Sequence, residues 1–309
     1  MAIIKAEEVA HVRFAAPHLG EMRSFLDDFG LPGAEGSTDG RLLSGGIDGQ
    51  VCHVTELGEP GFLGMAMRAS SVADLEVLAH AVKAPVQQLN LPGGGSFARL
   101  TDPDGFVIDV IAGQGPAAPE AIPARHPWNS ALDRPRRNEV KRLAPGPATV
   151  LRLGHVGLAV SDVQRTVDWW SEHLGVLVSD EIRTPEGHYA AAFLRCDRGD
   201  IPTDHHSLNF ATLPSGRTGF HHAAFEVIDF DDLVLGGEYL AQRQRERIWG
   251  VGRHILGSQV FDYWADPWGH KVEHWTDGDV LTADDETRVQ GLEVMTGVQW
   301  GPGLPSTFL

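Results

Sequence analysis

The chain has 309 residues, of which 42% are hydrophobic and 22% charged, so it is long enough for two ordinary globular domains. Its net charge of −17 disfavours nucleic acid and anionic membranes as partners, because both are polyanions. No apolar run approaches a membrane span, and the two cysteines, Cys52 and Cys196, form no CxxC motif, which favours a cytoplasmic protein without disulfides.

The first half opens with a predicted strand over residues 10–16 and a helix that ends near Gly30. A further strand is expected over residues 61–66. Ser71 then precedes apolar residues at helical intervals, which predicts a helix beginning at this serine. A turn and a strand over residues 102–109 complete the half. The order is strand, helix, then several strands.

Residues 114–148 separate the halves and have a different composition. Seven prolines fall between positions 116 and 147. Neither a helix nor a central strand tolerates that density, because proline lacks the backbone donor. We therefore predict a linker laid along the surface.

The second half repeats the order of the first. A predicted strand over residues 153–160 is followed by a helix, marked by Ser161 and Gln164 at capping-box spacing. The apolar residues of this helix recur at helical intervals, namely Val163, Val167, Trp170 and Leu174. Segments 206–210 and 219–227 are expected to form adjacent antiparallel strands.

A hairpin turning at residues 265–269 ends the second half at Glu273. Because the two halves share the same order of elements, we predict duplicated domains. We divide the chain into an N-terminal structural domain (1–113), the linker (114–148), a C-terminal metal-binding domain (149–278) and a tail (279–309). The tail has no counterpart in the first half and could be a lid, a brace or a subunit contact.

Three residues of the second half form a candidate metal site: His155, His222 and Glu273. Each lies on a predicted strand, and alternation places both histidines on faces with small neighbours. A single strand histidine is usually a hydrogen-bonded core or surface residue. Two imidazoles and one carboxylate at matching points of a repeat instead favour a divalent ion with open positions, an arrangement that suits non-heme Fe(II).

The first half provides an internal comparison. His11 and Asp109 stand where the first histidine and the carboxylate of the second half stand, but Gly64 replaces His222. Losing one of three ligands should remove much of the metal affinity. The first half is therefore predicted to be a structural copy without an intact site.

Three further residues could serve this site. His206 lies 16 residues before His222 on a predicted strand and could exchange a proton with a bound ligand, whereas His205 is interpreted as a strand-edge residue. The hydroxyl of Tyr263 could hydrogen-bond a ligand oxygen, and His254 could approach from a loop. From the residues alone, packing for Tyr263 and surface exposure for His254 are the more ordinary interpretations.

At these residues the chain resembles the type I extradiol ring-cleaving dioxygenases of the vicinal oxygen chelate superfamily, from about Val9 to Gly278. The resemblance rests on Gly-His155-Val, Asp-His-His206-Ser-Leu-Asn-Phe, Phe-His-His222-Ala-Ala-Phe-Glu-Val, Gly-Arg-His254, Phe-Asp-Tyr263 and Asp-Pro-Trp-Gly-His-Lys-Val-Glu273. It implies an α+β fold of tandem βαβββ modules, with two domains that are each a curved mixed sheet enclosing a cavity.

The resemblance also implies roles for the site residues. The metal would be Fe(II), with Mn(II) possible, held by His155, His222 and Glu273. His206 would be the acid–base, and His254 and Tyr263 would contact substrate or intermediate. One departure from the family pattern is Gly257, where some relatives have an acidic residue.

The implied function is the cleavage of a catechol-type ring with O2 to a semialdehyde or keto acid in aromatic degradation. The expected partners are a catecholic small molecule, O2 and further copies of the chain in a homo-oligomer, without nucleic acid or membrane. Two alternatives on the same scaffold stay open: a glyoxalase-like metal-dependent isomerase or lyase, and a non-enzymatic protein that binds small molecules.

Overall fold

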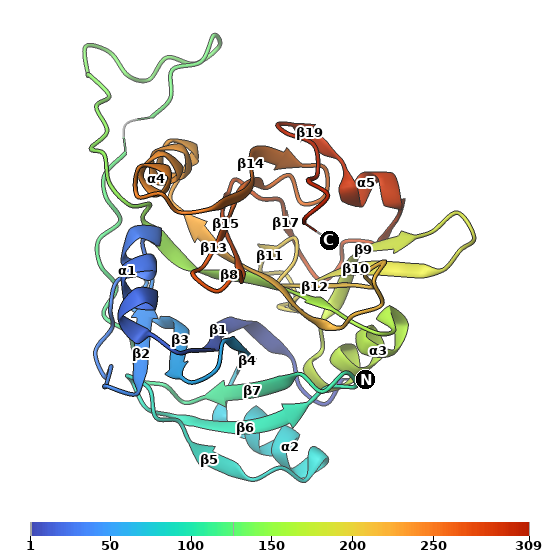
Figure 1. The fold of residues 1–309 in the computed structure, drawn as a ribbon. Helices are drawn as coiled ribbons and strands as arrows, with labels where there is room; N and C mark the ends of the chain where they lie inside the picture. Colours follow the sequence, from blue (N-terminus) through green and yellow to red (C-terminus); the bar gives the residue numbers. More distant parts are fainter. Residues whose placement is uncertain (1, 126, 309) are drawn as a thin grey trace.

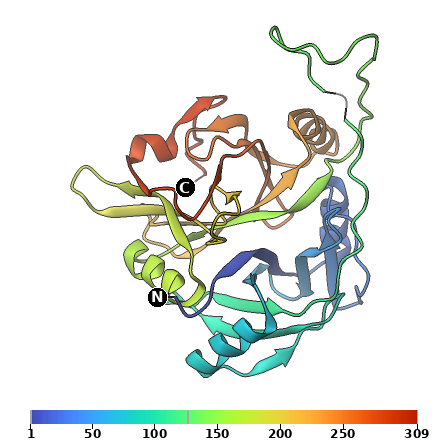
Figure 2. The same cartoon turned by 180° about the vertical axis from the view of Figure 1, so that it is seen from behind.

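The fold is built from two curved mixed sheets, one from each half of the chain. The computed structural model describes residues 2–125 and 127–308. In Figure 1 the N-terminal sheet lies below the C-terminal sheet, and Figure 2 shows the same two layers from behind. The α+β architecture of tandem curved sheets is therefore confirmed.

The first sheet has seven strands in the order β2-β3-β1-β4-β7-β6-β5. These strands are β1 (Ala6–Ala16), β2 (Arg41–Gly45), β3 (Val51–Leu57), β4 (Gly61–Ala69), β5 (Val86–Gln88), β6 (Ser96–Thr101) and β7 (Val107–Ala112). Two helices accompany the sheet, α1 (Leu19–Phe29) and α2 (Val72–Val82).

The second sheet has ten strands in the order β18-β9-β10-β12-β8-β13-β16-β15-β14-β19. Its strands are β8 (Val150–Ala159), β9 (Leu177–Arg183), β10 (Tyr189–Arg195), β12 (Leu208–Ala211), β13 (Gly219–Val227), β14 (Arg247–His254), β15 (Val260–Ala265), β16 (Lys271–Thr276), β18 (Arg288–Gly291) and β19 (Val298–Trp300). The other elements are β11 (Thr203–Asp204) paired with β17 (Val280–Leu281), and the helices α3 (Val163–Leu174), α4 (Phe230–Gln242) and α5 (Leu292–Thr296).

The strand registers of the two halves coincide. In each half one strand pairs antiparallel with the next core strand, which then pairs parallel with a third: β1, β4 and β7, and β8, β13 and β16. A central alanine is paired on both sides with equivalent positions: Ala66 with His11 and Asp109, and Ala224 with His155 and Glu273. The correspondence drawn from the sequence is thus a true structural repeat.

One predicted pairing is wrong. The strand after His206 does not pair with β13, because β8 lies between them and pairs parallel with β12 and antiparallel with β13. His206 itself precedes β12, which begins at Leu208. The spacing along the chain fits a hairpin equally well, so only the sheet order distinguishes the two arrangements.

The predicted start of α2 is confirmed, whereas the predicted cap of α3 is corrected. Ser71 caps α2, with its side chain accepting a hydrogen bond from the backbone of Asp74. The predicted capping box of α3 is wrong, because the helix is capped by Asp162, which accepts from the backbone of Arg165. Gln164 instead donates to Asp168 one turn further on.

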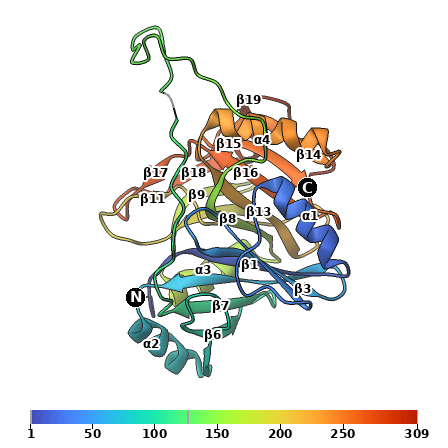
Figure 3. The same cartoon turned by 90° about the vertical axis from the view of Figure 1, so that its left-hand side faces the viewer.

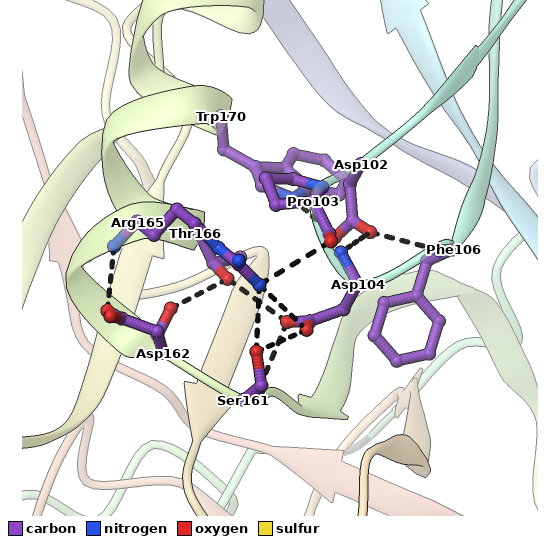
Figure 4. A network of polar contacts seen from close by, with 9 residues as sticks. All are labelled: Asp102, Pro103, Asp104, Phe106, Ser161, Asp162, Arg165, Thr166 and Trp170. Carbon is purple, nitrogen blue, oxygen red and sulfur yellow. Dashed lines mark hydrogen bonds and ion pairs between the residues drawn. The ribbon is translucent and has the colours of Figure 1, made fainter.

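Ser161 does not cap α3 because it hydrogen-bonds to Asp104, a residue of the first half of the chain. Figure 4 shows the turn between β6 and β7 placing Asp104 at the start of α3, where its carboxylate accepts from Ser161, Arg165 and Thr166. A carboxylate is favourable there, because the free backbone donors give a helix N-terminus a partial positive charge. The buried Trp170 also donates to the neighbouring Asp102 at 3.4 Å.

The two halves share one continuous core. A single cluster of buried apolar residues includes members from both sheets. Phe220 packs on Phe14 and Phe62 with ring centroids 5.0 and 4.8 Å apart. His274 stacks on Phe29 at 3.8 Å, and its Nε2 lies 2.8 Å from the carbonyl oxygen of that residue. This packing fixes one sheet against the other.

The linker leaves the body of the molecule. The described residues between Gly113 and Thr149 form no helix or strand, which agrees with their proline content. They run along one side and project beyond the two sheets (Figures 1 and 3). The division of the chain into domains at residues 113, 148 and 278 stays a prediction.

Candidate metal centre

The three predicted ligands converge on adjacent strands at the centre of the second sheet. His155 lies on β8, His222 on β13 and Glu273 on β16. The Nε2 atoms of the two histidines are 3.1 Å apart, and they lie 3.3 and 3.7 Å from Oε2 of Glu273. Among the described residues, this is the group of histidine, cysteine and acidic side chains whose ligand atoms lie close enough to hold an ion.

The spacing and the burial of these atoms fit a metal ion. Bonds of roughly 2.1 Å to an octahedral ion would place neighbouring ligand atoms about 3 Å apart. Glu273 is 0% exposed, and neither of its carboxylate oxygens has a hydrogen-bond partner among the described residues. A buried carboxylate without a partner is strongly unfavourable, and a divalent cation would compensate it.

Burial also keeps the surrounding histidines in their neutral form. It lowers the pKa of His222 well below the usual value, and the nearby His221 and His155 lower it further. Burial similarly lowers the pKa of His206 and brings that of His254 to about 3. Neutral imidazoles are the form that can bind a metal or accept a proton.

The equivalent place in the first half is filled by ion pairs. Asp109 lies 3.1 Å from a guanidinium nitrogen of Arg13 and 2.7 Å from Nε of Arg99. Gly64 contributes no side chain at the position of the second histidine. The carboxylate is therefore neutralised by arginines, and the described residues of this half contain no comparable ligand cluster.

A cavity lies over the metal ligands. Its lining includes His155, His222, His206, His254 and Tyr263 together with mainly apolar walls. The C-terminal tail forms one of these walls, with side chains from Val294, Met295, Thr296, Leu304 and Phe308. Of the three roles that the sequence left open for the tail, covering the site is the one its position supports.

Tyr263 and His254 form a pair at one side of the cavity. The tyrosine hydroxyl and Nε2 of His254 are 3.1 Å apart. Trp249 stacks nearly parallel to the ring of Tyr263, while Phe261 stacks on His254 at 4.0 Å. The interpretation of His254 as a surface residue is wrong, because β14 turns its ring inward. Burial, followed by the charge of Glu273, raises the pKa of Tyr263 well above its usual value and keeps the hydroxyl protonated.

The interpretation of His205 as a strand-edge residue is also wrong. Its ring is buried between Asp180 and His206, at 2.6 Å from the carboxylate and 3.0 Å from the second imidazole. No pattern in the sequence pointed to Asp180, which comes from the distant strand β9. Its contribution became visible only in the folded chain.

Gln259 lines the cavity and was also missed by sequence reasoning. It is buried, and neither amide atom has a hydrogen-bond partner among the described residues. Strand alternation was the available signal, because residues 259, 261 and 263 share one face of the chain leading through β15. An unpaired buried amide facing a cavity is a candidate contact for a polar ligand atom.

The second half of the chain matches a known protein family. Residues 152–274 match the family model described as the Glyoxalase/Bleomycin resistance protein/Dioxygenase superfamily. Over nearly its full length the chain is similar to metapyrocatechase 2 of Cupriavidus necator, with 29% identity across 97% of this chain and 91% of the relative.

Solved structures share the fold at lower identity. The Mn(II)-bound glyoxalase of Novosphingobium aromaticivorans superposes with a TM-score of 0.80 at 21% identity, covering 99% of this chain and 95% of its own. A substrate complex of homoprotocatechuate 2,3-dioxygenase from Brevibacterium fuscum gives 0.77 at 19% identity, covering 99% and 92%. No helix in residues 2–125 or 127–308 is long and apolar enough to span a membrane.

Proposed function

We infer that this chain, a member of the glyoxalase/bleomycin resistance protein/dioxygenase superfamily with extradiol-dioxygenase relatives over nearly its full length, cleaves a catechol-type ring with O2. The observation that carries this proposal is that five of the predicted site residues line one cavity, with the fully buried Glu273 grouped with two of them as a metal ligand set. His155, His222 and Glu273 would hold a metal ion, and His206, His254 and Tyr263 surround the space beside it.

We propose Fe(II) as the metal, with Mn(II) as an alternative, because imidazole and carboxylate ligands suit both ions. Bound there, the ion would supply a Lewis acid that can hold the catechol and O2 together and pass electrons between them. Three protein ligands on one side would leave the cavity side of the ion accessible.

The remaining polar residues would manage protons and orientation. Neutral His206 can accept a proton from a catechol hydroxyl and later return it. The hydroxyl of Tyr263 and the ring of His254 can hydrogen-bond a substrate oxygen, and their own contact at 3.1 Å holds them in place. The tail would exclude water from the reacting atoms.

We propose that the preferred substrate is an uncharged catechol with an apolar substituent. The lining residues of the cavity include no lysine, arginine, aspartate or glutamate. A substrate carboxylate buried there would have no cationic partner and would lose its hydration. Apolar side chains such as Phe193, Leu256 and Phe308 would instead favour alkyl or aryl groups.

The direct test is oxygen uptake. Protein loaded anaerobically with Fe(II) is mixed with air and a panel of catechols, both uncharged and carboxylated, while absorbance reports a yellow ring-fission product. Uptake matched by product, greatest for uncharged catechols, is the expected result. Protein with bound metal but without uptake for any catechol would point to a glyoxalase-like isomerase or lyase. A chain that binds no metal would point to a binding protein.

We further propose that the protein is cytoplasmic and assembles into a homo-oligomer. Both cysteines are buried and unpaired, which supports a reducing compartment. Exposed apolar side chains on the projecting linker, Trp128 and Leu132 among them, support association. Light scattering on the purified chain tests the second point, and a monomeric mass would contradict it.

A further inference from the structure

Behind His206 lies a chain of buried hydrogen-bonding groups that the proposed reaction does not yet use. Asp180, on β9, is 1% exposed, and its Oδ2 lies 2.6 Å from Nε2 of His205. The Nδ1 atoms of His205 and His206 are 3.0 Å apart. The ring of His206 then lines the cavity. The three side chains connect the interior of the sheet to the candidate metal centre.

With His205 neutral, hydrogen-bond chemistry assigns a position to each proton. A carboxylate can only accept, so Nε2 of His205 must carry the hydrogen that reaches Asp180. Nδ1 of neutral His205 is then an acceptor, and Nδ1 of His206 must be the donor that reaches it. Neutral His206 is thereby left with a lone pair on Nε2, at the opposite edge of its ring. This nitrogen is the one available to a ligand in the cavity.

We propose that Asp180 and His205 are positioning residues that hold His206 in the tautomer with a basic Nε2 facing the substrate. This inference rests on the proposed function. Without the relay, the ring of His206 could carry its proton on either nitrogen and could rotate. In the wrong tautomer it would present an N–H to the catechol hydroxyl and could not accept a proton. The logic is that of the buried aspartate in a Ser-His-Asp triad, which holds its histidine in the correct tautomer.

The surroundings support a dedicated role for His205. Among the described residues, its ring is the hydrogen-bond partner of Asp180, whose other oxygen, Oδ1, has none. Gly257 lies against the same ring: a Cβ there would be 2.9 Å from Nδ1 of His205. The hydroxyl of Ser179 donates to the carbonyl oxygen of His205 at 2.6 Å. The residue that departs from the family pattern at 257 thus leaves space for the relay.

The proton transfer balances within this set of groups. The catechol O–H bond breaks and an N–H bond forms at Nε2 of His206, which becomes an imidazolium. The Nδ1–H of His206 still donates to Nδ1 of His205, and the Nε2–H of His205 still donates to the carboxylate of Asp180. The buried negative charge of Asp180 therefore stabilises the positive charge on His206 through one intervening ring, and no further reactant is needed.

The test compares two relay variants, D180N and H205Q, with the control E181Q. D180N replaces the carboxylate by an amide of the same size. Glu181 is the next residue on β9, is half-buried and pairs with Arg183, so E181Q makes the same chemical change outside the relay. The probe is 4-nitrocatechol, added anaerobically to Fe(II)-loaded protein, because its visible spectrum distinguishes one lost proton from two. Only folded protein binds the probe, so misfolding cannot imitate the result.

We expect wild type and E181Q to bind the probe with both protons lost, and D180N and H205Q to retain one. Turnover of an uncharged catechol should fall about 10- to 100-fold in D180N and H205Q, the usual effect of losing a partner behind a site residue. Identical spectra for the bound probe in wild type, D180N and H205Q would overturn the relay. Absence of ring cleavage by wild type would refute the proposed function, while the relay is judged on the probe spectra alone.

Discussion

At the scale of single residues, the surroundings of a carboxylate decide what it does. Asp109 and Glu273 occupy equivalent strand positions in the two halves. Two arginines neutralise Asp109, whereas Glu273 faces two imidazoles and has no hydrogen-bond partner among the described residues. The same backbone geometry therefore yields an ion-pair cluster in one half and a metal site in the other.

This contrast predicts different effects for the same change at the two positions. Glu273→Gln should abolish metal binding, because the negative charge that compensates the cation is lost. Asp109→Asn should keep the metal and the activity, and should lower the free energy of unfolding by about 1–3 kcal/mol through the loss of buried charged contacts. Metal content by mass spectrometry and denaturation curves check both. Equal metal loss in the two variants would mean that the active half is misassigned.

Tyr263 provides a second prediction at this scale. Tyr263→Phe removes the hydroxyl beside His254 and keeps the ring that Trp249 stacks on. Turnover should fall roughly 10- to 100-fold with the metal content unchanged, because an oriented donor to the substrate is lost. Tyr239→Phe is the matched control, since its hydroxyl meets Arg243 at the surface. Unchanged turnover in Tyr263→Phe would return this residue to a packing role.

At the scale of elements, α3 depends on a residue from the other half of the chain. Asp162 caps the helix locally, and Asp104 adds a second carboxylate from the turn between β6 and β7 (Figure 4). Trp170, on the same helix, is fully buried. The helix is therefore held by its own cap, by its apolar face and by a contact across the two halves.

The cross-half contact can be measured by removing it. Asp104→Ala should lower the free energy of unfolding by about 1–2 kcal/mol, because several donors at the helix start lose their acceptor. Asp168→Ala, an exposed change on the same helix, should stay within about 0.5 kcal/mol of wild type. Urea denaturation of the three proteins gives both numbers. A loss in Asp104→Ala no greater than in Asp168→Ala would show that the contact adds no stability.

At the scale of the whole molecule, the shared core encloses several histidines away from the metal centre. His53 stacks on Phe14, and burial lowers its pKa to about 3. Burial also lowers the pKa of His11 to about 4. Both residues are neutral in the folded chain at neutral pH, and both would titrate near 6.5 when the chain unfolds.

This burial predicts that stability falls with acidity. Below a pH of about 6.5 the unfolded chain binds protons that the folded chain does not, so the free energy of unfolding decreases by up to about 1.4 kcal/mol per pH unit for each histidine. The stabilisation is present at higher pH and is lost as the pH falls towards about 4. Urea denaturation at about pH 7.5 and about pH 5.5 should show a smaller decrease for His53→Phe than for wild type. Equal decreases would mean that His53 binds a proton as readily in the folded chain as in the unfolded chain.

The sequence alone determined what depends on residue type and on local order. The repeat, the proline-rich linker, the helix that begins at Ser71 and the three ligand types at matching points can all be read along the chain. Local patterns carry this information, because strand alternation and proline chemistry act over a few residues.

Tertiary structure decided what depends on residues far apart in the chain. It placed β8 between β12 and β13, drew Ser161 away from the cap of α3 towards Asp104, and closed the cavity with the tail. It also buried His205 between His206 and Asp180, 25 residues away along the chain from His205. A hydrogen bond across a sheet depends on strand order and register, and neither quantity is encoded in the spacing of the residues that it joins.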